Sequence, residues 1–79
     1  MSTKNNPGKF DCYANAAPDE EMFILLARDI TAPKLVRDWA LRRQDMIEIG
    51  EKPVSDQAMV DEALECAAKM ETWRKVNRP

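Results

Sequence analysis

Two amphipathic stretches joined by the short link 50–54 constrain most strongly what this chain can fold into. Gly50 accepts the positive φ at which many helices end, and Pro53 cannot continue a helix. We therefore predict one helix over 32–49 and another over 55–76. Because the link between them is short, the two helices should run antiparallel as a hairpin.

The second stretch carries a heptad-like apolar seam, whose members are Met59, Ala63, Cys66, Met70 and Trp73. The first stretch offers a matching stripe, made of Leu35, Val36, Trp39, Ala40, Met46 and Ile47. Thr31 is the expected N-cap of the first helix and Ser55 that of the second. Folding the hairpin about Lys52 places Trp39 opposite Cys66 and sends Trp73 back toward Thr31, to within about a turn.

A third, shorter helix is predicted over 18–28. Pro18 is tolerated in a first turn, and the acidic residues 19–21 lie against the positive end of the helix dipole. Residues 22–27 are all apolar, a run too short for periodicity to separate a helix from a buried strand. The acidic, proline-led start favours the helix.

The predicted fold class is therefore all-α, with a short helix followed by an antiparallel helical hairpin. Residues 1–12 contain no apolar periodicity and are expected to form a flexible tail, which leaves a single small helical domain over 13–79. Residues 10–17 have no predictable conformation, although they could lie on the core as a lid. A chain of 79 residues buries only about 60% of its unfolded surface, so this core should be small.

Composition argues against several classes of function. The chain has 12 basic and 14 acidic residues, a balance that disfavours a nucleic-acid binder, which needs a clustered basic face. It has no histidine, the commonest general base and a usual zinc ligand, and no glycine-rich phosphate-binding motif. We therefore expect no enzymatic activity, no catalytic residue, no metal and no cofactor.

The expected location is the cytoplasm. Cys12 and Cys66 do not form a CxxC motif, and the polar N-terminus does not resemble a secretory signal, so both thiols should be free. No apolar run approaches the ~20 residues that span a bilayer, and no membrane association is expected.

The turn between the first two predicted helices is the candidate ligand site. The candidate residues are Arg28, Asp29, Lys34, Arg37, Trp39 and Trp73. The basic side chains should converge near free backbone N–H groups of the helix that follows, which predicts an anion pocket with a tryptophan as a stacking face. In the competing and commoner arrangement, Arg28 caps its own helix and pairs with Asp29, while Lys34 pairs with Asp38 on the surface.

The predicted helix 18–28 has more apolar surface than a two-helix hairpin can cover. Met22, Phe23 and Leu26 are therefore candidate interface residues, most simply in a two-fold homodimer. The alternative is a three-helix core within one chain.

The segment from Asp11 to Trp39 reads D-C-Y-x-N-A-x-P-D-E-x-M-F-x-L-L-A-R-D-x-x-A-P-x-L-V-x-x-W and resembles small proteins encoded by phages and prophages. It covers about a third of the chain. Those proteins have prolines at the positions of Glu21 and Ile30. The entry to the first predicted helix and the turn before the second should therefore be shaped differently in this chain. The resemblance implies a phage accessory protein in the host cytoplasm, of a kind that often counters host defence by binding. It implies no activity and no catalytic residue.

Two hypotheses follow. In the first, the protein is a non-enzymatic inhibitor that docks on a host protein through its apolar and mixed-charge helical surface. In the second, it is an oligomeric module that sequesters an anionic small molecule, such as a nucleotide signal, at the Arg28–Arg37 junction. The first is narrowly preferred, since helical surfaces are commoner than pockets in chains this short.

Overall fold

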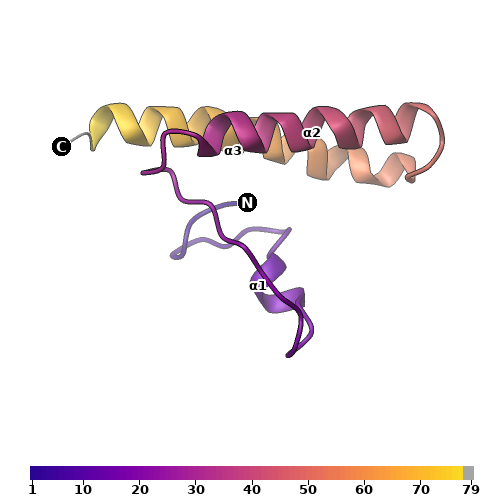
Figure 1. Ribbon diagram of the computed structural model, residues 1–79, viewed down its shortest axis with the longest axis horizontal. Coiled ribbons are helices and arrows are strands. Elements are labelled where there is room, and N and C mark those ends of the chain that lie inside the picture. The colour runs from indigo at the N-terminus through magenta and orange to yellow at the C-terminus, as the bar shows by residue number, and fades with distance from the viewer. Residues whose placement is uncertain (78–79) are drawn as a thin grey trace.

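The computed structural model describes residues 1–77, and these residues contain helices but no strand. The order is α1 (Cys12–Asn15), α2 (Ala32–Glu48), the 3-10 turn η1 (Val54–Asp56) and α3 (Gln57–Val76). The all-α class with three α-helices is confirmed. As Figure 1 shows, α2 and α3 form one long antiparallel hairpin, and the chain before α2 lies to one side of it. No described helix is both long and apolar enough to cross a membrane.

The hairpin turn follows the prediction. Gly50 has a φ of 83°, and its N–H donates to the carbonyl of Ile47 at 3.2 Å. The N–H of Glu51 donates to the carbonyl of Met46 at 2.8 Å, which completes a Schellman C-cap. Ser55 lies in η1 instead of capping α3, so the predicted start of that helix is two residues early.

Polar contacts fix the register of the two long helices. Arg43 pairs with Asp56 at 3.1 Å, and the amides of Gln44 and Gln57 exchange hydrogen bonds of 2.9 and 2.6 Å. These pairs lie on either side of Lys52, so the predicted fold of the hairpin about this residue is confirmed to within about a turn.

The core between α2 and α3 is small. Its fully buried members are Ala32, Ala40, Val60, Ala63 and Ala67. Val60 is the largest of them, and Val36, Ile47 and Met1 pack against the cluster that it forms with Ala40 and Ala63. Small residues let the two helices approach closely, but they bury little apolar area, and the hydrophobic contribution to stability scales with that area.

Of the predicted seam on α3, Ala63 is fully buried, and the other buried residues of this helix are the neighbours Val60 and Ala67. The face that packs on α2 runs through Val60, Ala63 and Ala67, whereas Met59, Cys66 and Met70 are only partly buried. Trp73 is 46% exposed. The heptad spacing therefore predicted the helix correctly, but it merged two neighbouring faces into one.

The predicted helix over 18–28 is wrong. Residues 20–26 have no regular secondary structure, and the short helix is α1, where the Asp11 carboxylate accepts the N–H of Ala14 at 3.2 Å. The carboxylate of Glu20 stabilises a local turn instead of a helix start, because it accepts the N–H of Ala17 at 3.0 Å. An isolated short helix is marginal in water, and an apolar run with no polar side gives it no single face to bury.

The N-terminal segment makes some contacts with the rest of the chain. Met1 packs on the core, and its ammonium group donates to the carbonyl of Phe10 at 3.3 Å. Thr3 and Asn6 exchange backbone hydrogen bonds of 3.1 Å. The flexibility predicted for residues 1–12 stays a prediction. Figure 1 shows α1 standing clear of the hairpin.

Candidate functional site

The antiparallel hairpin places the start of α2 beside the end of α3. An open groove of about 560 Å³ lies there and is called the basic groove below. Its lining residues are Ile30, Pro33, Lys34, Arg37, Glu71, Arg74 and Lys75. Four of these side chains are basic and one is acidic, so the groove attracts anions although the whole chain has a net charge of −2.

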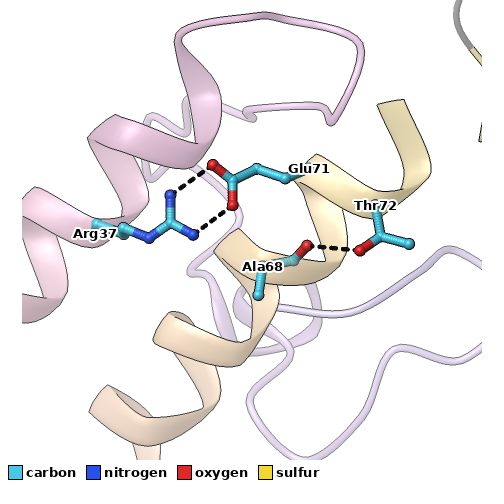
Figure 2. A network of polar contacts seen from close by, with 4 residues as sticks. All are labelled: Arg37, Ala68, Glu71 and Thr72. Atoms are coloured by element: carbon cyan, nitrogen blue, oxygen red, sulfur yellow. Dashed lines mark hydrogen bonds and ion pairs between the residues drawn. The ribbon is translucent and has the colours of Figure 1, made fainter. Parts of the chain in front are cut away.

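Arg37 of α2 and Glu71 of α3 form a two-pronged ion pair in this groove. As Figure 2 shows, the two terminal guanidinium nitrogens of Arg37 face the two carboxylate oxygens of Glu71, at 2.9 and 2.6 Å. The pair faces solvent, with the side chains 37% and 49% exposed. Hydrogen bonding by the guanidinium lowers the pKa of Glu71, and the carboxylate raises the pKa of Arg37. On the same turn of α3, the Thr72 hydroxyl donates to the carbonyl of Ala68.

The turn before α2 forms one end of the groove. Arg74 donates to the backbone carbonyl of Arg28 at 2.8 Å, which fastens this turn to α3. Asp29 accepts the backbone N–H of Thr31 at 2.9 Å and its hydroxyl at 2.7 Å, and these bonds lower the pKa of the Asp29 carboxyl. Thr31 therefore occupies the predicted N-cap position of α2, but its side chain bonds to Asp29 instead of capping the helix.

The structure brings together only some of the predicted site residues. Lys34 and Arg37 line the groove, whereas Arg28 contributes its carbonyl and Asp29 closes the turn. The predicted backbone contribution is smaller than expected, because the N–H of Ala32 donates to the carbonyl of Asp29 and Pro33 has none.

The competing arrangement, in which these charged side chains pair with near neighbours in the sequence, does not form either. The ion pairs within residues 1–77 are Arg37–Glu71, Arg43–Asp56 and Lys69–Glu65. Neither Arg28–Asp29 nor Lys34–Asp38 is among them. Lys34 and Lys75 thus have no ion-pair partner within the described part of the chain, which leaves both ammonium groups free to meet an anion.

Neither tryptophan lines the basic groove. Trp39 is 38% exposed, and the guanidinium of Arg43 lies 5.1 Å from its ring centroid, a cation–π contact. Trp73 lines a second cavity of about 460 Å³, together with Leu25, Leu26 and the N-terminal segment. The stacking face predicted for the anion pocket is therefore absent from the groove lining.

The predicted interface residues are exposed on a single chain. Met22 is 49%, Phe23 87% and Leu26 50% exposed, and they belong to the apolar segment, residues 22–26. An exposed cluster of large apolar side chains is typical of a surface that a partner covers. The partner itself stays a prediction.

Sequence reasoning missed the three charged groove residues that α3 supplies, namely Glu71, Arg74 and Lys75, as well as the apolar Ile30 and Pro33. The signal was present in the predicted hairpin register, since folding about Lys52 brings the last turns of α3 beside the start of α2. The spacing of four between Glu71 and Lys75 also suits a surface pair within α3, so the sequence alone does not distinguish that pair from one across the hairpin.

The donors in the groove suit an anion and not a metal. Guanidinium and ammonium groups are hydrogen-bond donors without a lone pair for a cation. Within residues 1–77, no group of three or more cysteine, aspartate or glutamate side chains is placed to hold a metal ion.

Comparisons of the chain with protein-family models, with curated proteins and with solved structures found no match.

Proposed function

We propose that this protein is a non-enzymatic binding module that holds an anionic small molecule in the basic groove. The observation that carries the proposal is the gathering of Lys34, Arg37, Arg74 and Lys75 from two helices around one open space. Its volume of about 560 Å³ lies in the range of small-molecule sites. Recognition of this kind needs only positioned cations and no reacting group.

We also propose that the module works as a homo-oligomer, most simply a dimer. The buried core consists of four alanines and one valine, whereas Phe23 and its neighbours in the apolar segment are exposed. A second copy that covers this segment would add apolar burial that the single chain lacks. The resemblance to phage-encoded proteins suggests the setting, the cytoplasm of an infected cell, where sequestering an anionic signal would counter a host defence.

A second candidate function is docking on a host protein. The exposure of the apolar segment supports it, because this surface needs a partner but does not specify which one. The two candidates differ in what the groove cations do: they hold the ligand in the first and lie outside the interface in the second.

Native mass spectrometry of protein purified without denaturation tests the proposal. We expect extra mass of small-molecule size on the wild type and its loss from the double variant Lys34→Ala/Lys75→Ala. The matched control is Arg42→Ala/Lys52→Ala, which removes the same charge from exposed positions outside the groove and should keep the ligand. Docking would be favoured instead if the wild type carries no extra mass and if both double variants still bind a host protein.

A further inference from the structure

The ion pair with Glu71 occupies the guanidinium fork of Arg37, that is, the two terminal N–H groups that would otherwise recognise a ligand. A guanidinium binds carboxylate or phosphate best through two parallel N–H···O bonds, and in Arg37 two terminal nitrogens already make such bonds to Glu71. The bonds are 2.9 and 2.6 Å long, so the carboxylate of Glu71 sits where an oxyanion would sit. The protein's own carboxylate therefore occupies the guanidinium of Arg37.

The other cations of the groove are not held in this way. Arg74 donates to the carbonyl of Arg28, and Lys34 and Lys75 have no ion-pair partner within residues 1–77. Glu71 is half exposed, so its side chain can turn into solvent without crossing a packed region. Displacing it needs no movement of either helix.

We propose that Glu71 is an internal competitor for the anion site of the basic groove, which a dianionic phosphate group displaces more readily than a single carboxylate does. This inference rests on the proposed anion-binding function. A monoanionic carboxylate that displaces Glu71 from Arg37 exchanges one carboxylate for another and gains little there. A phosphate dianion presents two oxygens to the fork and still carries charge to attract Lys34 and Lys75.

Amide chemical-shift titration by NMR tests this inference on the full chain, with inorganic phosphate and acetate as probes at a pH where phosphate is dianionic. We expect wild-type protein to bind phosphate more tightly than acetate. Glu71→Gln should bind both probes about three- to tenfold more tightly, because the fork is free and a repelling charge is gone. The preference for phosphate should persist or grow, since the carboxylate of Glu71 repels a dianion more strongly than it repels acetate. The matched control, Glu65→Gln, removes a carboxylate paired to Lys69 on the same helix and should match the wild type.

Glu71→Asp separates occupation of the fork from simple charge. It keeps the carboxylate but withdraws it by one methylene, so we expect affinity between those of the wild type and Glu71→Gln. Wild-type affinity in Glu71→Asp would overturn the inference, as would equal phosphate affinity in the wild type and Glu71→Gln. In both cases the proposed function would stand. If neither phosphate nor acetate shifts the amide signals of the groove in the wild type or in Glu71→Gln, the proposed function itself fails.

Discussion

Replacing Phe23 with serine tests whether the apolar segment is where copies of the chain meet. The Phe23 side chain is 87% exposed, so it contributes almost nothing to the stability of a single chain. Full burial of such a side chain is worth about 1.5–3 kcal/mol. A two-fold interface buries it twice, so the substitution should cost about 3–6 kcal/mol of association free energy. That loss raises the dissociation constant by roughly two to four orders of magnitude.

Sedimentation velocity over a dilution series measures this effect directly. We expect the wild type to form dimers or larger assemblies and Phe23→Ser to sediment as a monomer over most of the series. Circular dichroism should show unchanged helix content, because residues 20–26 are not helical. The matched control is Val54→Ser, which removes a 78% exposed apolar side chain beside the hairpin turn. It should associate like the wild type.

Two results would refute the reasoning. A wild type that is monomeric throughout the series has no interface for Phe23 to join. A Phe23→Ser variant that dissociates no more readily than Val54→Ser would place the interface elsewhere on the molecule.

Three further predictions concern the hairpin and the turn before it. Val60→Ala should lower the free energy of unfolding by about 2 kcal/mol in urea denaturation, while Val76→Ala, which changes a 78% exposed side chain, should leave it unchanged. Gly50→Ala should cost about 1 kcal/mol in the same assay, because a Cβ there meets no atom within 4 Å but the φ of 83° disfavours it. The Asp29 carboxyl has a lowered pKa, so its contribution to stability is present above its ordinary pKa of 3.8 and is lost as the pH falls through the lowered value. Thr31→Val removes the hydroxyl bond but keeps the larger effect of the backbone N–H, so it should raise that pKa only part of the way back, as measured by carboxyl ¹³C NMR.

The hairpin was predictable because its determinants are local. Gly50 stops α2 through a left-handed residue, and Pro53 prevents the helix from continuing through the link. Both effects depend on the residue itself and not on distant partners. The run 22–27 is different, since its conformation depends on what covers it. Its acidic start favours a helix, but that preference is small, and nothing within residues 1–77 covers the run closely enough to add the packing that a short helix needs.

The groove was predictable only in part, for a related reason. Lys34 and Arg37 are close in sequence and share one end of α2, so their proximity needed no tertiary contact. Glu71 reaches Arg37 across the hairpin, and a register known to about a turn does not decide whether Glu71 pairs across helices or with Lys75. The two-pronged geometry open to a guanidinium favours the pair across the hairpin.

The turn 27–31 connects the apolar segment with the basic groove. It leads from the apolar segment into α2, and its residue Ile30 also lines the basic groove. Arg74 fastens it to α3 by a hydrogen bond to the carbonyl of Arg28, and Asp29 and Thr31 close it internally. The turn is thus continuous with the apolar segment on one side and with the basic groove on the other. A partner on the apolar segment and an anion among the groove cations would therefore act on the same short stretch of backbone.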